Sequence, residues 1–261
     1  MKNERKDRKK RPLAIAHRGL PTRYLENTLP SFRHAMELGA DMIELDVQEL
    51  LSGELVVFHD FNLERLARDP RELTDLNLTQ VNGITIQSFK NKALKPSKIP
   101  LFQDVLNSLD DHIQVDIELK TLSWRKTPLA VDTVRLIEKM GLNGRVMVSC
   151  FSYPQLVYVR KLDPTIRVGF LTDYPRGYFV LEPLIPKRWR PDILVLNFAR
   201  LSSKLVETLK SRYQIFVFTV DRVEDMRRLI EWGVDGIITN QLERLKKLLD
   251  EQFGKNEDKQ P

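Results

Sequence analysis

Short apolar runs rich in β-branched residues alternate along the chain with segments in which apolar residues recur every three or four positions. The first pattern predicts buried strands, and the second, as in VEDMRRLIEWG, predicts amphipathic helices. The predicted strands are 13–17, 42–47, 54–59, 113–119, 145–150, 166–171, 192–196, 214–220 and 235–239, and the predicted helices are 28–38, 101–110, 127–140, 153–162, 202–211, 222–231 and 240–252. Roughly eight strand–helix units in a chain of this size predict a parallel sheet closed into a (β/α)8 TIM barrel.

One predicted strand is surplus to a barrel of eight. Only about six residues separate Val47 from the strand 54–59, which is too few for the crossover that joins parallel strands. We therefore predict a hairpin-like excursion after the second strand, with Ser52-Gly53 as a two-residue turn that places His59 opposite Asp46. The residues that follow, about 60–98, are predicted to form an irregular insertion at the C-terminal rim, where long loops commonly shape a substrate site.

The composition is that of a globular protein with a large core, since 42% of its 261 residues are hydrophobic. No apolar run approaches the roughly 18–20 residues of a membrane span, and the N-terminus lacks the apolar centre of a secretory signal. A cytoplasmic protein is therefore expected. The single cysteine, Cys150, excludes an internal disulfide, and its apolar neighbours in RVMVSCF predict a small core residue.

The net charge of +6 is concentrated at the start of the chain. Residues 1–12 hold seven lysines and arginines against two acids, which predicts a basic disordered leader. A single barrel domain, 13–252, and a polar tail, 253–261, are expected to follow. The leader is suited to peripheral contact with an anionic membrane. It lacks interleaved aromatic residues, so no nucleic-acid partner is expected.

Carboxylates are placed on two predicted strands where apolar residues are usual. Glu44 and Asp46 are two positions apart and so share one face of a strand, and the same holds for Asp116, Glu118 and Lys120. Buried carboxylates need compensation, and a shared divalent cation would supply it. Oxygen-only ligands favour Mg²⁺ or Ca²⁺. The alternative is a network of ion pairs in which basic side chains neutralise the acids.

Two of the four histidines, His17 and His59, end predicted strands that flank these acids. An imidazole beside a cation site is suited to general acid–base catalysis, because it exchanges a proton near neutral pH. The basic residues Arg18 and Lys120 directly follow two of the predicted strands, beside these acids and histidines. They indicate an anionic substrate, and a phosphate is the anion that such residues most often bind.

Several motifs in this order resemble the glycerophosphodiester phosphodiesterase family, which is related to the phosphoinositide-specific phospholipases C. They are AHRG (16–19), ENTLPSFRHAMELGADMIELDV (26–47), GELVVFHDFNLER (53–65), IPLFQDVL (99–106), DIELK (116–120) and GVDGIITN (233–240). Together they span the chain from residue 13 to about 245, and the ordered set is far more specific than any one motif.

The resemblance implies a role for each matching residue. His17 and His59 match the catalytic histidines, as general acid and base. The implied ligands of one divalent cation, Mg²⁺ or Ca²⁺, are Glu44, Asp46 and Glu118, and the implied substrate-binding residues are Arg18, Lys120 and Phe218. The implied reaction is hydrolysis of a small-molecule glycerophosphodiester to sn-glycerol 3-phosphate and an alcohol. The head group and the oligomeric state are left open.

The chain departs from the family pattern at a few positions. Ser52-Gly53 stands where the family usually has an Asp-Gly turn. The sequence FTVD (218–221) replaces the usual WTVN and places Asp221 where an amide is usual. The last strand ends in Thr-Asn, with Asn240, where the family usually has Thr-Asp. Two alternative functions remain. One is a lysophospholipase D-type activity on membrane lysophospholipids, which Ile84, Ile86, Phe89 and residues 175–186 would support by docking. The other is a catalytically silent phosphate- or lipid-binding barrel.

Overall fold

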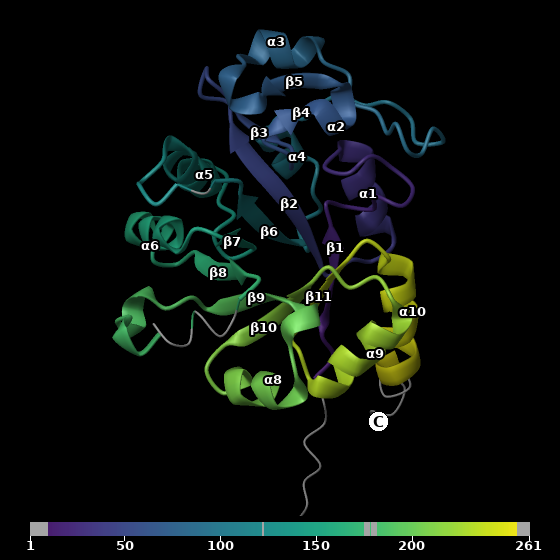
Figure 1. Cartoon of the computed structure of the whole chain (residues 1–261), viewed down its shortest axis with the longest axis vertical. Coiled ribbons are helices and arrows are strands. Elements are labelled where there is room, and N and C mark those ends of the chain that lie inside the picture. Colours follow the sequence, from purple (N-terminus) through teal and green to yellow (C-terminus); the bar gives the residue numbers. More distant parts are fainter. Residues whose placement is uncertain (1–9, 122, 175–177, 179–181, 255–261) are drawn as a thin grey trace, which may run out of the picture.

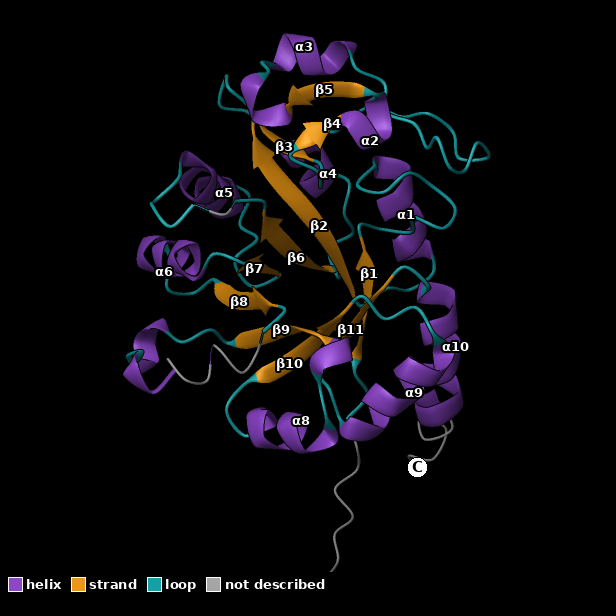
Figure 2. Cartoon of the chain, in the orientation of Figure 1, coloured by secondary structure: helices purple, strands orange, loops and turns teal. Residues whose placement is uncertain are grey.

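The computed structural model describes residues 10–121, 123–174, 178 and 182–254. Eight parallel strands close into a barrel because β1 (Leu13–His17) pairs with both β2 and β11, which confirms the predicted TIM barrel. The other barrel strands are β2 (Met42–Glu49), β6 (Gln114–Leu119), β7 (Val146–Cys150), β8 (Arg167–Thr172), β9 (Ile193–Asn197), β10 (Gln214–Phe218) and β11 (Gly236–Thr239). Helices surround the strands (Figures 1 and 2): α1 (Leu29–Glu37), α4 (Phe102–Asn107), α5 (Pro128–Lys139), α6 (Tyr153–Leu162), α8 (Ser203–Lys210), α9 (Val223–Trp232) and α10 (Leu242–Phe253).

Strand β2 extends beyond the barrel and folds back as the predicted hairpin with β3 (Leu55–Val57). Its register differs from the predicted one, because Val47 pairs with Val57 and the N–H of Phe58 donates to the carbonyl of Asp46 at 2.9 Å. The prediction that His59 faces Asp46 was therefore wrong by one residue. The loop is three residues long, and Gly53 at φ +93° supplies the left-handed residue that such a loop requires.

The insertion is more regular than predicted. It holds a two-stranded sheet, β4 (Asn62–Leu63) with β5 (Asp69–Glu72), together with α2 (Glu64–Ala67), η1 (Leu73–Asp75) and α3 (Leu78–Gly83). These elements lie beyond the end of the β2–β3 hairpin (Figure 1) and pack around a second hydrophobic cluster, to which Leu25 of the β1–α1 loop and Val56 of the hairpin also contribute. Ile86 is buried in that cluster and Ile84 packs against it, so Ile86 is not available to a membrane.

The two ends of the insertion meet. The N–H of Val57 donates to the carbonyl of Pro100 at 3.0 Å, and Val56 forms an antiparallel bridge with Leu101. Helix α4 starts immediately afterwards, at Phe102. The chain thus leaves the barrel and returns to it at one place.

The start of the barrel loop that follows β1 depends on a glycine. Arg18 and Gly19 have φ of +55° and +83°, and a Cβ at Gly19 would overlap the Ser31 hydroxyl and lie 2.8 Å from the Ser31 carbonyl carbon. That hydroxyl accepts a 2.6 Å hydrogen bond from the N–H of Leu20 and donates to the carbonyl of Arg18. The contact fixes the loop against the first turn of α1.

Gly19→Ala is expected to lower the free energy of unfolding by roughly 2–4 kcal/mol, since the left-handed backbone and the overlap both oppose a side chain. Gly53→Ala is the matched control, because Gly53 also has a positive φ but has no atom within 4 Å of its would-be Cβ. It is expected to lose about 1 kcal/mol. Urea unfolding would measure both, and equal losses would contradict the role of the overlap.

Cys150 is fully buried, as predicted, and its thiol donates to the carbonyl of Leu119 at 3.3 Å. Burial raises the pKa of the Cys150 thiol to about 12. Because the thiolate is the reactive species, we expect no labelling of the folded protein by a thiol reagent at pH 8, and one thiol per chain after unfolding in guanidinium. Rapid labelling of the folded protein would contradict this.

The predicted leader lies mostly outside the described residues, as does most of the predicted polar tail. Of the leader, the structure describes Lys10, Arg11 and Pro12, and the guanidinium of Arg11 pairs with Asp41 at 2.8 Å. No helix in the part of the chain that the structure describes is both long and apolar enough to cross a membrane.

Candidate active site

The register of the barrel strands brings the predicted site residues into two layers. His17 on β1 pairs with Glu44 on β2, and Glu44 pairs with Asp116 on β6. Two residues further along β2, Asp46 pairs with Glu118. These side chains lie at the C-terminal ends of the strands, where a cavity of about 180 Å³ opens. The residues that line it are His17, Arg18, Glu44, His59, Asp116, Glu118, Lys120, Ser149, Phe151, Leu171, Phe218, Thr219 and Ile238.

Glu44, Asp46 and Glu118 form a cluster in which one oxygen of each lies within 4.8 Å of the others. Their exposed fractions are 3%, 0% and 8%, so the carboxylates do face the barrel interior. Burial, together with the charges of Asp46 and Glu118, raises the pKa of Glu44 well above its usual range. Burial opposes the charge on Asp46 as well, but Arg18 and Lys120 hold its pKa below the usual value.

Arg18 and Lys120 are the cations of the cluster. The Nε of Arg18 lies 3.2 Å from Asp46 Oδ2, and Lys120 Nζ lies 2.8 Å from Glu118 Oε1 and 3.5 Å from Asp46 Oδ1. The backbone N–H of Arg18 also donates to Glu44 Oε2 at 3.0 Å. Part of the alternative prediction, an ion-pair network, is therefore present.

That network does not balance the charge. Arg18 also pairs with Glu26, at 2.9 Å. The three clustered carboxylates are therefore opposed by the full positive charge of Lys120 and by only part of that of Arg18. Asp46 Oδ1 is buried and has no hydrogen-bond partner. An unsatisfied carboxylate oxygen beside two other carboxylates fits an oxygen-preferring divalent cation. The two interpretations of the sequence are thus compatible, since the basic residues offset some of the charge and leave the rest for an ion.

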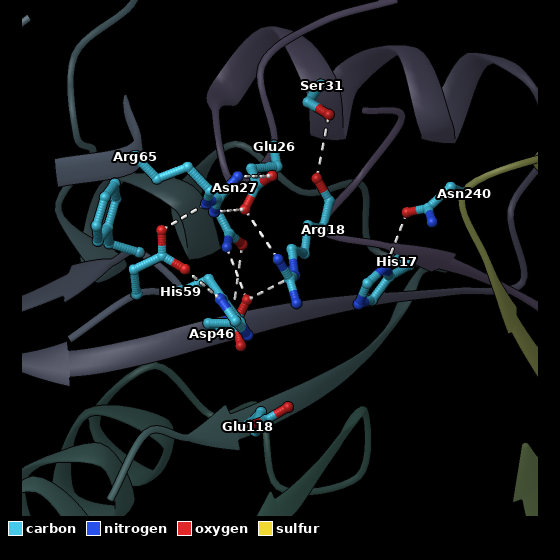
Figure 3. Close-up of polar contacts among 12 residues, drawn as sticks. His17, Arg18, Glu26, Asn27, Ser31, Asp46, His59, Arg65, Glu118 and Asn240 are labelled. Carbon is cyan, nitrogen blue, oxygen red and sulfur yellow. Dashed lines mark hydrogen bonds and ion pairs between the residues drawn. The ribbon is translucent and has the colours of Figure 1, made fainter. Parts of the chain in front are cut away.

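His17 lies at the end of β1 with Nε2 directed at the carboxylates, 3.9 Å from Glu44 Oε2. Its Nδ1 lies 2.8 Å from the side-chain oxygen of Asn240, which follows β11 (Figure 3). Burial and, to a smaller extent, the charge of Arg18 lower the pKa of His17 to about 4. In the folded protein near pH 7 its imidazole is therefore neutral.

His59 follows the hairpin and reaches the cavity from the other side. The side chain of Gln48 on β2 donates to the carbonyls of Phe58 and Asp60, each at 2.8 Å, and so holds the backbone on both sides of His59. His59 Nδ1 lies 2.7 Å from Asp60 Oδ1. Burial opposes the charge of Asp60, but hydrogen bonds from His59 and Arg65 hold the pKa of Asp60 well below its usual range.

Comparison with known proteins agrees with this geometry. Residues 17–244 match the model of the glycerophosphoryl diester phosphodiesterase family. A glycerophosphodiester phosphodiesterase of Caldanaerobacter subterraneus subsp. tengcongensis is 34% identical over 240 residues, 91% of this chain and 97% of its own length. The chain belongs to this family. A solved glycerophosphodiester phosphodiesterase of Thermotoga maritima is 27% identical, with a TM-score of 0.73 over 90% of this chain and 98% of its own.

A more distant solved structure shares the fold. The phosphodiesterase of Oleispira antarctica, solved in complex with the product sn-glycerol-3-phosphate, is 22% identical, with a TM-score of 0.80 over 92% of this chain and 97% of its own.

Phe218, which keeps an aromatic at the family's usual position, ends β10 and lines the cavity. Its ring meets that of Phe151 edge to face, with centroids 6.2 Å apart. Asp116, which the strand alternation predicts to face inward, is buried and pairs with Glu44 across the two strands. Burial, and to a smaller extent the nearby charges of Glu118 and Asp46, raise its pKa to about 7.

Sequence analysis gave no role to the polar residues that support Arg18 and His59 from the outside. Arg65 donates to Glu26 and to Asp60, with distances of 2.6–2.8 Å, and so joins the β1–α1 loop to the insertion (Figure 3). Asn27, at φ +57°, donates to Asp46 Oδ2 at 2.8 Å. Both Glu26 and Asn27 stand in the family motif ENT, which was the available signal.

Proposed function

We propose that this protein hydrolyses glycerophosphodiesters to sn-glycerol 3-phosphate and an alcohol, with one divalent cation at Glu44, Asp46 and Glu118 and with His17 and His59 as general base and general acid. The observation that carries the proposal is the meeting, at one cavity, of two cationic side chains, two histidines and a carboxylate trio of which Glu44 and Glu118 line the cavity. The family relationship and the product complex of the Oleispira antarctica protein support it.

The residues fit a cation of the Mg²⁺ or Ca²⁺ type, since all three donors are carboxylate oxygens and Asp46 Oδ1 has no hydrogen-bond partner, with Lys120 Nζ 3.5 Å away. When bound, such a cation polarises a phosphoryl oxygen and offsets the charge that develops on it. Arg18 and Lys120 line the same cavity and can donate to the other phosphate oxygens, which adds to that stabilisation.

The division of roles between the histidines follows from their partners. His17 Nδ1 faces a neutral amide oxygen, which leaves Nε2 to accept a proton from the attacking hydroxyl, whether of water or of the substrate's glycerol. His59 Nδ1 instead lies 2.7 Å from the Asp60 carboxylate, so this histidine has a negatively charged partner where His17 has a neutral one. His59 is thus suited to give its proton to the leaving alcohol.

The experiment that tests the proposal measures glycerol 3-phosphate release from glycerophosphocholine with a coupled dehydrogenase. The purified protein is used metal-stripped and then with Mg²⁺ or Ca²⁺ restored. Metal-dependent release is the expected result. If folded, metal-restored protein releases nothing from this or other glycerophosphodiesters or from lysophospholipids, the proposal fails and the catalytically silent barrel is favoured.

A second candidate, action on lysophospholipids at a membrane, is favoured by two exposed aromatic side chains. Trp124 and Tyr174 are 69% and 65% exposed and follow β6 and β8, so both stand on the rim that surrounds the cavity. Of the residues that the sequence suggests for docking, Ile86 is buried and half of 175–186 lies outside the described part. Release of choline from lysophosphatidylcholine vesicles at a rate above that from glycerophosphocholine would favour this candidate.

A further inference from the structure

The two departures from the family pattern at the ends of β10 and β11 meet in the structure. Asp221, three residues after β10, accepts hydrogen bonds at 2.8 Å from both the backbone N–H and the side-chain NH₂ of Asn240. It also accepts one from the hydroxyl of Thr239 at 3.1 Å. Amide and carboxylate have therefore exchanged places between two positions that touch each other.

This contact determines which way the Asn240 amide faces. An ionised carboxylate only accepts hydrogen bonds, so the side of Asn240 that faces Asp221 must be its NH₂ group. The opposite orientation would place the amide oxygen against a carboxylate oxygen. The side-chain oxygen of Asn240 is consequently the atom that faces His17, 2.8 Å from Nδ1 (Figure 3).

An amide oxygen is an acceptor, so Nδ1 of His17 must be the donor. In a neutral imidazole the other nitrogen then carries the lone pair. That nitrogen, Nε2, is the atom of His17 that lies nearest the carboxylate cluster, 3.9 Å from Glu44 Oε2. The lone pair is thereby directed into the cavity.

We propose that Asp221 and Asn240 are positioning residues that hold His17 in the Nδ1–H tautomer, with the carboxylate acting on the histidine through the amide and not directly. The inference rests on the proposed function for its catalytic consequence, because a base in the other tautomer would present an N–H to the nucleophile. The tautomer itself is independent of that function and can be measured alone.

The kinetic test uses four proteins: the wild type, Asp221→Asn, Asn240→Asp and the double exchange D221N/N240D. Asp221→Asn leaves the Asn240 amide free to turn, and Asn240→Asp sets two carboxylates against each other. We expect each single change to lower kcat by about 100-fold at similar KM, as for a misplaced catalytic group. In the double exchange the amide donates to the new carboxylate, which accepts from His17, so kcat is expected to return to within about tenfold of the wild type.

The spectroscopic test reads the tautomer without turnover. The protein is labelled with ¹⁵N-histidine and kept in Mg²⁺ at neutral pH, and the His17 signals are assigned by their loss in His17→Gln. We expect a protonated Nδ1 and an unprotonated Nε2 in the wild type and the double exchange, and a mixture in Asp221→Asn. Circular dichroism and the Tm of each variant show that the barrel is intact.

The possible results separate the two proposals. Wild-type His17 in the opposite tautomer, or single variants with unchanged kcat, would overturn the positioning role even in an active enzyme. A double exchange no better than the single changes, in folded protein, would also overturn it. An inactive wild type that shows the expected tautomer would instead contradict the proposed function and leave the hydrogen-bond chain confirmed.

Discussion

His17→Ala is expected to lower kcat for glycerophosphocholine by about 10³–10⁴, the upper part of the range for loss of a general acid–base group. His59→Ala is expected to have a loss of similar size. Both histidines line the cavity, and the neutral state of His17 follows from the burial that lowers its pKa to about 4. The coupled release of glycerol 3-phosphate, at saturating Mg²⁺, is the measurement.

The matched control is His34→Ala on α1, because His34 pairs with Glu37 on the surface and does not line the cavity. It is expected to keep wild-type kcat. The roles of the two catalytic histidines are separated by a glycerophosphodiester with a p-nitrophenol leaving group, which needs no proton. With that substrate His59→Ala is expected to recover most of its rate and His17→Ala none, and the reverse pattern would exchange the assigned roles.

Glu44→Gln is expected to change stability in opposite directions with and without a divalent cation. Burial and the two neighbouring carboxylates raise the pKa of Glu44, so at neutral pH this acid lowers the stability of the metal-free protein, and its replacement by glutamine should raise the Tm of that form. Wild-type protein should gain about 2.7 kcal/mol when Mg²⁺ is present at 100 times its Kd, whereas the variant should gain much less. We expect its kcat to fall by about 100-fold or more. Differential scanning calorimetry on both forms measures the stability changes.

Glu49→Gln serves as the control for this substitution. Glu49 lies at the end of the same strand, is separated from Glu44 by an odd number of positions, and so faces away from the barrel interior. Glu49→Gln should leave the gain of stability on Mg²⁺ addition unchanged. An equal gain of stability on Mg²⁺ addition in Glu44→Gln and wild type would place the cation elsewhere.

Much of the barrel can be predicted from the sequence, because polar and apolar residues alternate with the two-residue period of a β-strand. On β2 and β6, residues two apart carry the acids, and the residues between them are apolar, so the inward face of each strand follows from the alternation alone. The family motifs then supplied roles that spacing does not. The cavity that collects Glu44, Glu118 and Lys120 was predicted on both grounds.

The errors have a physical origin. One residue in a hairpin loop decides which side chains face each other, and Ser52-Gly53 suits either a two-residue turn or the last two positions of a three-residue loop. The bond between Asn240 and Asp221 joins the ends of two neighbouring strands, so it needs the register of the closed barrel. The link of Arg65 to Glu26 spans 39 positions and depends on how the insertion folds back.

The meeting of the insertion's two ends has a consequence for engineering. Residues 58 to 99 leave and re-enter the barrel through the contact of Val57 with Pro100, and the insertion packs around a hydrophobic cluster that is completed by Leu25, Leu50 and Val56. Such a segment can be exchanged as a cassette: the corresponding loop of another family member, of different length, can be grafted between Val57 and Pro100. His59, Asp60 and Arg65 would have to be carried along with the graft, because they connect the cassette to the catalytic cavity.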